Sequence, residues 1–198
     1  MPSAILCRLK DETAGRHRVV EQLARADRIL DHTLTLAQYS RLIVANYAIH
    51  QLIEPQLLPL FSPPWVDRLQ LAQRSRLTAL QYDLAQLNLN PPGFPQLTYL
   101  IQTIPQALGA LYVLEGATLG GAVILKALQK NPHVNGVAPF HYYGLCGRNT
   151  RALWLGFCQT LNEWVDSSDV GDAIVAAAQE TFDFYRRLLV AAPEEIRD

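Results

Sequence analysis

Four glycines lie within thirteen residues of a segment that otherwise has the composition of one long buried helix, GALYVLEGATLGGAVILKAL. They are Gly109, Gly116, Gly120 and Gly121. Glycine inside a helix costs about 0.5–1 kcal/mol relative to alanine. At about 100° per residue, Gly109, Gly116 and Gly120 project within about 40° of one another and form a bare stripe. We therefore expect a neighbouring helix or a large flat ligand to lie against this stripe.

Nearly every other segment also has the pattern of a helix. The expected helices are residues 10–30, 35–60, 64–87, 104–130, 150–165 and 170–190. Thr35 and Asp169 are expected N-caps, and Pro64 suits a first helical position. The segments 88–95 and 131–149 are expected loops because they are rich in helix-breaking residues. With no alternating β-branched runs, the sequence predicts one all-α domain over residues 1–198 with six or more helices.

Composition narrows the class of protein. The 198 residues are 49% hydrophobic and 18% charged, with a net charge of -1. This balance fits a well-filled core and provides no global field for nucleic acid or an anionic membrane. No apolar run reaches the ~18–20 residues of a membrane span, and the start of the chain lacks a secretory signal pattern. The three cysteines, Cys7, Cys146 and Cys158, are expected as core filler in a reducing cytoplasm.

Two histidines each precede a glutamate by four residues: His17 with Glu21, and His50 with Glu54. Such pairs on separate helices are a feature of carboxylate-bridged di-metal sites. The remaining long helices offer carboxylates without histidine, namely Glu115, Glu180 and Asp183. A single histidine that faces a glycine stripe suits a haem instead, because haem needs one axial nitrogen and an apolar slot.

Three segments resemble haem oxygenases. LKDETAGRHRVVE is similar to the proximal-helix signature L-K-x-x-T-x-x-x-H-x-x-x-E of that family. LYVLEGATLGG is similar to the distal-helix motif L-Y-V-x-E-G-[SA]-x-L-G-[GA] of its bacterial branch, and FHYYGLCGRNTRALWLGF resembles the F-x-x-Y-G loop and the W-x-x-F that follows it. These matches extend from residue 9 to residue 157, and the likeness is closest to haem oxygenases found alongside bacterial phytochromes.

The resemblance assigns roles to named residues. His17 would be the axial ligand of the haem iron through Nε2, Glu21 would orient its ring, and Lys10 would reach a haem propionate. It also implies that the haem lies between the first and fourth long helices. The distal floor, which steers the reaction, would consist of Gly116, Gly120 and Gly121.

Aromatic residues near these motifs are expected as walls and core. Tyr112 and Phe140 are expected in the core or in the wall of the pocket, and Tyr112 is also a candidate haem contact. Trp154 and Phe157, three apart at helical spacing, are expected in the core.

The sequence departs from the animal-type members of the family at two places. Ala117 stands where they carry a distal aspartate, whose role would be to hold the water network that protonates bound dioxygen. In this chain, water held by the backbone and by another side chain would take that role. The basic residues of their fifth helix have no match in LWLGFCQTLNEW, and Arg186 and Arg187 on the last helix are proposed in their place.

The resemblance implies an enzyme with haem as both cofactor and substrate. It would consume O2 and external electrons and release biliverdin, carbon monoxide and Fe2+. The electron donor would be ferredoxin or an NAD(P)H-dependent reductase, and a bilin-binding photoreceptor could use the product. Two alternatives stay open at this point: a haem storage or delivery protein without turnover, and a di-metal oxidase on the same scaffold.

Overall fold

The structure, a computed structural model, describes residues 4–90, 93–94, 96–145, 147, 149–165 and 167–193. Every regular element within those residues is helical, which confirms the expected all-α class. In chain order the elements, with η for a 3₁₀ helix, are α1 (Ala4–Leu23), α2 (Ala26–Leu30), α3 (Leu36–Leu57), η1 (Leu58–Leu60), α4 (Pro63–Leu69), α5 (Leu71–Arg74), α6 (Leu77–Gln86), α7 (Ile104–Leu119), α8 (Gly121–Lys130), η2 (Asn135–Val137), α9 (His141–Gly144), α10 (Thr150–Trp164) and α11 (Ser168–Ala191).

Side-chain caps define where the long helices begin. The hydroxyl of Thr35 accepts a hydrogen bond from the Gln38 backbone N–H at 3.3 Å, and the Gln38 side chain accepts one from the Thr35 N–H at 3.1 Å. This capping box confirms Thr35 as the N-cap of α3. For α11 the expected cap is wrong. Ser167 has an extended backbone and its hydroxyl accepts from the Val170 N–H, so Asp169 lies inside the first turn.

Two of the expected long helices are broken by a residue with left-handed backbone angles. Arg25, with φ 58°, separates α1 from α2, and Gln70, with φ 52°, separates α4 from α5. A left-handed residue cannot continue a right-handed helix, which is why the expected single helices over 10–30 and 64–87 are wrong. The expected loop over 131–149 also contains structure, in η2 and α9.

The expected helix over 104–130 bends by 43° between α7 and α8. Its two adjacent glycines, Gly120 and Gly121, lie at the break, and glycine-containing pairs are frequent sites of helix kinks. The carbonyl of Gly120 accepts the N–H of Ile124 and starts the new helix. No single helix among the described residues is long and apolar enough to cross a membrane, although the bent pair passes that test together.

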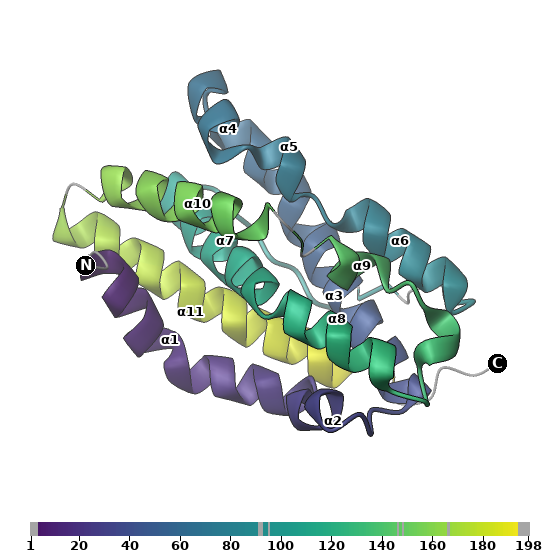
Figure 1. The fold of residues 1–198 in the computed structure, drawn as a ribbon. Coiled ribbons are helices and arrows are strands. Elements are labelled where there is room, and N and C mark those ends of the chain that lie inside the picture. Colours follow the sequence, from purple (N-terminus) through teal and green to yellow (C-terminus); the bar gives the residue numbers. More distant parts are fainter. Residues whose placement is uncertain are drawn as a thin grey trace.

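The long helix α11 packs along both α1 and α7 (Figure 1). It approaches α7 at Gly109, where an added Cβ atom would lie 2.6 Å from the Cβ of Ala177 and 2.6 Å from the backbone oxygen of Ile174. Only glycine allows the two backbones to come this close. At Gly109 the glycine stripe therefore packs against a neighbouring helix, which is one of the two possibilities that the sequence left open.

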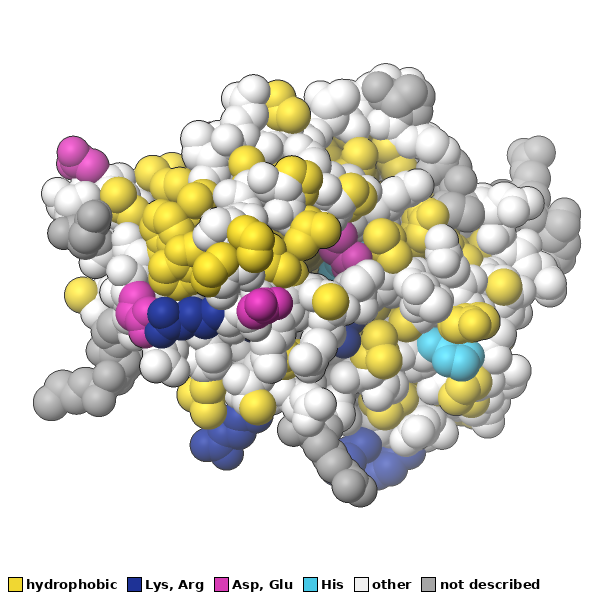
Figure 2. All heavy atoms as spheres, turned by 90° about the horizontal axis from the view of Figure 1, so that it is seen from above, with side chains coloured by type: hydrophobic (Ala, Val, Ile, Leu, Met, Phe, Trp, Pro, Cys, Tyr) yellow, Lys and Arg dark blue, Asp and Glu magenta, His cyan; other side chains and the backbone are white. Residues whose placement is uncertain are grey.

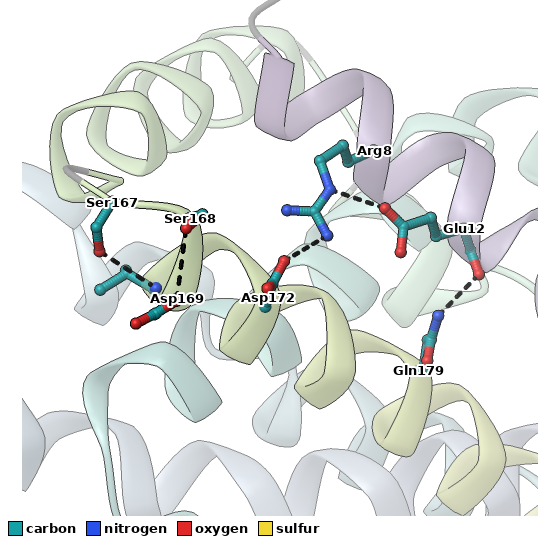
Figure 3. A network of polar contacts seen from close by, with 8 residues as sticks. Arg8, Glu12, Ser167, Ser168, Asp169, Asp172 and Gln179 are labelled. Carbon is teal, nitrogen blue, oxygen red and sulfur yellow. Dashed lines mark hydrogen bonds and ion pairs between the residues drawn. The ribbon is translucent and has the colours of Figure 1, made fainter.

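Polar contacts hold α1 against the opposite side of α11 (Figure 3). Arg8 forms ion pairs with Glu12 of its own helix and with Asp172 of α11, both at 2.8 Å, and the side chain of Gln179 donates to the backbone carbonyl of Glu12. These exposed pairs contribute little to stability individually. Together they fix the position of α1 along α11, which matters because α1 carries His17.

Seen from above, hydrophobic side chains gather over the part of the surface formed by α10 and α4 (Figure 2). Trp65 of α4 and Trp164 of α10 pack with ring centroids 5.1 Å apart, and Leu155 stays 57% exposed. Of the cysteines, Cys158 is buried as expected, Cys7 is exposed, and Cys146 lies outside the described residues.

The contact at Gly109 predicts opposite effects of the same substitution at two helical glycines. Gly109→Ala should lower the free energy of unfolding of the ligand-free protein by about 1–2 kcal/mol, because overpacking outweighs the gain in helix propensity. Gly156→Ala in α10 should raise it by about 0.5–1 kcal/mol, since an added Cβ there meets nothing within 4 Å. Urea denaturation followed by circular dichroism measures both, and two changes of the same sign would contradict the interpretation.

Candidate functional site

A cavity of about 420 Å³, called the central cavity below, is lined mainly by α1 and α7, with further residues from α3, α9, α10 and α11. Its lining comes from α1 (Lys10, Thr13, Ala14, His17, Arg18, Val20), α3 (Asn46, Ile49, His50), α7 (Tyr112, Val113, Leu114, Gly116, Ala117, Leu119), α9 (Tyr142), α10 (Trp154) and α11 (Phe182, Tyr185). Its size falls within the range of small-molecule sites, and most of the lining is apolar or aromatic.

His17 projects from α1 into this cavity and keeps 52% of its side chain exposed. Its Nδ1 lies 3.5 Å from Oε2 of Glu21, one helical turn on, and its ring packs edge-on against Phe182 with centroids 5.7 Å apart. The Nδ1 separation exceeds a normal direct hydrogen bond. Because Glu21 faces Nδ1, the other nitrogen, Nε2, is the one available to a ligand.

The four glycines of the segment 109–121 have three different roles. Gly116 lines the cavity together with Ala117, and a Cβ atom added at Gly116 would meet nothing within 4 Å. Gly120 and Gly121 are absent from the cavity lining and mark the bend into α8. Gly109 contacts α11 instead. The bare stripe expected from helical spacing is therefore not one surface, because the bend and the contact with α11 divide it.

Among the described residues, the lysine and arginine side chains that line the cavity both come from α1. Lys10 was expected there, whereas Arg18, which directly follows His17, was missed. The arginines expected on the last helix lie elsewhere. Arg186 is exposed and absent from the lining, and the guanidinium of Arg187 lies over the ring of Phe184 at 5.3 Å.

The aromatic residues expected near the pocket lie in different surroundings. Tyr112 lines the cavity with its ring 5.9 Å from that of Trp154, and burial raises the pKa of its hydroxyl. Phe140 and Phe157 are fully buried core residues. Phe140 adopts a left-handed backbone, and the carboxylate of Asp83 accepts hydrogen bonds from the two N–H groups that follow it, at 2.6 and 2.8 Å.

A second histidine, His50, also lines the central cavity, and its side chain is only 3% exposed. The sequence did not predict a role for His50 in this cavity. Its Nδ1 lies 2.7 Å from Oε1 of Glu54, and its Nε2 lies 3.4 Å from the hydroxyl of Tyr142. Both Ser75 and the Arg76 backbone N–H also donate to Glu54. Burial alone would raise the pKa of Glu54, but these three hydrogen bonds outweigh it and hold the pKa below its ordinary value.

The imidazole of His50 also borders a second cavity, of about 340 Å³. Glu54, Arg74 and Glu115 line that cavity, and the side chains of Arg74 and Glu115 form a buried ion pair. Burial raises the pKa of Glu115, with Arg74 opposing the shift, and burial lowers the pKa of Arg74, with Glu115 opposing it. His50 and Leu114 are shared by the linings of the two cavities.

The two His–Glu pairs are not brought together. In the part of the chain that the structure describes, no three His, Cys, Asp or Glu side chains lie close enough to hold a metal ion. His50 and Glu54 instead bind each other, and His17 faces the cavity from another helix.

Comparisons with known proteins agree with this arrangement. A family model described as "Heme oxygenase" matches residues 96–191, which include α7 through α11 but not His17. No curated protein sequence matches the chain significantly. Several solved structures do match in their fold.

A haem oxygenase from Neisseria meningitidis superposes with a TM-score of 0.74 at 21% identity, covering 98% of each chain. Haem oxygenase-1 from the cyanobacterium Synechocystis, solved with haem, gives 0.71 at 15% identity and covers 95% of this chain and 91% of that one. A haem oxygenase from Leptospira interrogans gives 0.73 at 14% identity, covering 94% of this chain and 98% of that one. At these identities the likeness shows the fold.

Proposed function

The chain belongs to the haem oxygenase family, and from that premise we propose that it opens haem oxidatively to biliverdin, carbon monoxide and Fe2+. O2 and electrons from a separate donor would drive the reaction. The observation that carries the proposal is the central cavity itself, whose lining includes both the imidazole of His17 from α1 and bare backbone at Gly116 of α7.

The residues of the cavity fit a haem. Nε2 of His17 would hold the iron, since Glu21 faces the other ring nitrogen and can orient the imidazole. Gly116 leaves open space beside its backbone, because an added Cβ atom would meet nothing within 4 Å. A larger residue would fill this space, whereas glycine leaves it free for a flat macrocycle. The lining is mainly apolar, as a porphyrin requires.

Two cations on α1 suit the two carboxylates of the substrate. Lys10 lies two turns before His17 and Arg18 directly follows it, so both line the same cavity as the proposed ligand. Each can form a charge-assisted hydrogen bond with a propionate. We assign this role to Lys10 and Arg18 in preference to Arg186, which is exposed and lies outside the cavity lining.

When bound, haem supplies the iron at which dioxygen is reduced and the ring carbon that is oxidised. The protein contributes position and exclusion of water. His17 fixes the ring on one side, and the backbone at Gly116 and Ala117 limits the space on the other. Gly120 and Gly121 contribute indirectly, through the bend that ends α7.

The remaining assignments are also proposals. The electron donor would be a ferredoxin or an NAD(P)H-dependent reductase in the cytoplasm, and a bilin-binding photoreceptor would be a consumer of the product. Membership of the branch found alongside bacterial phytochromes rests on the distal-helix motif LYVLEGATLGG.

The proposal predicts that the protein consumes haem and depends on His17 to do so. With ascorbate as electron donor under air, the Soret band of the haem complex should decay while biliverdin absorption appears in the red, and added catalase should not prevent this. His17→Ala should abolish product formation and change the ferric spectrum, because the iron loses its axial nitrogen.

His133→Ala is the matched control, since His133 is exposed and does not line the cavity. It should behave as the wild type, and circular dichroism should show both variants folded. Stable reduced haem without biliverdin would indicate a carrier instead of an oxygenase. Loss of the spectrum in His50→Ala but not in His17→Ala would move the ligand to His50.

A second prediction concerns the open space at Gly116. Gly116→Val should weaken haem binding about tenfold or more, which corresponds to about 1.4 kcal/mol, because its methyl groups enter the cavity. Gly136→Val, in the exposed η2, provides a control that also meets nothing within 4 Å. Haem titration of both variants measures the difference. Equal affinities would show that the ring does not lie against Gly116.

A further inference from the structure

Ala117 lines the central cavity and has no acidic side chain. Opening the ring consumes protons, and Ala117 of α7 cannot supply them. Two ionisable residues line the central cavity away from α1 and α7 and also bind each other: His50 of α3 and Tyr142 of α9. They therefore offer a route for protons into the cavity.

We propose that Glu54, His50 and Tyr142 form a proton relay that donates a proton into the central cavity: Glu54 holds the His50 ring, and the mobile proton moves from Nε2 of His50 through the Tyr142 hydroxyl. This inference rests on the proposed function, since the relay serves the proton demand of that reaction. The three side chains lie in sequence, with 2.7 Å from Glu54 Oε1 to His50 Nδ1 and 3.4 Å from His50 Nε2 to the Tyr142 hydroxyl.

The tautomer of the neutral His50 ring identifies the nitrogen whose proton moves. Glu54 accepts hydrogen bonds from the Ser75 hydroxyl and the Arg76 N–H, so it is held as a carboxylate. Its remaining partner, Nδ1 of His50, must then carry a proton and donate it. That leaves Nε2 as the nitrogen that gains and loses a proton, and Nε2 is the one that faces Tyr142.

Glu54 holds His50 from the side of the second cavity. Glu54 keeps 13% of its side chain exposed and borders the second cavity, and Ser75 is exposed. The other charged groups of this region are Arg74, Arg76 and Glu115, all buried. Arg74 and Glu115 pair with each other, which leaves Glu54 as the carboxylate that serves His50.

Each transfer is balanced without any redox change. The Nε2 proton of a doubly protonated His50 moves to the Tyr142 oxygen while the Tyr142 hydroxyl proton moves to the acceptor in the central cavity. One N–H and one O–H bond break, and two O–H bonds form. Tyr142 ends neutral, and His50 ends neutral with its proton on Nδ1. A solvent proton that enters the central cavity, where the His17 side chain is 52% exposed, restores the ring by the reverse transfer through Tyr142.

A test on the haem-loaded protein uses Tyr142→Phe, which keeps the ring and the backbone hydrogen bond to Asp83 but removes the hydroxyl. It should slow haem consumption with ascorbate about tenfold or more and alter the ratio of rates in H2O and D2O, with haem affinity unchanged. Tyr39→Phe is the matched control, because Tyr39 is buried on the same helix as His50 and its hydroxyl has no hydrogen-bond partner among the described residues. Wild-type rates and isotope ratio in Tyr142→Phe would overturn the relay while leaving the proposed function intact.

A second measurement judges the relay independently of turnover. In the ligand-free protein, the ¹⁵N shifts of His50 should show a proton on Nδ1 and a lone pair on Nε2 when the ring is neutral, and Glu54→Gln should weaken this preference. A neutral ring with its proton on Nε2 in the wild type would overturn the relay even if haem is consumed. If haem stays intact while the Nδ1 tautomer is present, the proposed function fails and the geometry of the relay stands.

Discussion

The close approach of α7 and α11 at Gly109 determines the rest of the site. With a Cβ atom excluded there, the two backbones meet, and α11 in turn carries α1 on its other side. The separation between His17 on α1 and Gly116 on α7 is therefore set by one helix packed against both. A cavity bounded by long helices with fixed spacing keeps its width without a ligand, which favours a site that is largely formed before binding.

Polar groups fix the other wall of the cavity. Asp83 of α6 caps α9 with two charge-assisted hydrogen bonds, which places Tyr142 beside His50. Glu54 binds His50 and also the Arg76 N–H at the start of α6. These hydrogen bonds thus connect α3 to α6, α6 to α9, and α9 back to α3. Burial raises the pKa of Asp83, and the hydrogen bonds from α9 oppose that shift.

The features that the sequence predicted correctly are those set by local pattern. The all-α class and the N-cap at Thr35 follow from helical spacing and capping pattern. His17, Lys10, Tyr112 and Gly116 line one cavity, and their roles toward haem stay predictions. Helix breaks escaped prediction because Arg25 and Gln70 are not residues that typically adopt left-handed angles.

Other features depend on tertiary contacts. The division of the glycines could not be read from spacing, since it depends on which neighbour each one meets. The sequence showed that His50 and Glu54 are four residues apart. Tyr142, the other partner of His50, lies 92 residues from it and could not be identified from spacing. Arg18 was missed because its place on α1 had to be judged against helices that the sequence does not position.

The central claim is that haem lies between α1 and α7 with its iron on His17. A crystal structure of the haem complex tests it most directly. The account predicts Nε2 of His17 on the iron, the propionates beside Lys10 and Arg18, and the far face of the ring against the backbone at Gly116 and Ala117. Iron bound to His50, or a ring held away from α7, would contradict it.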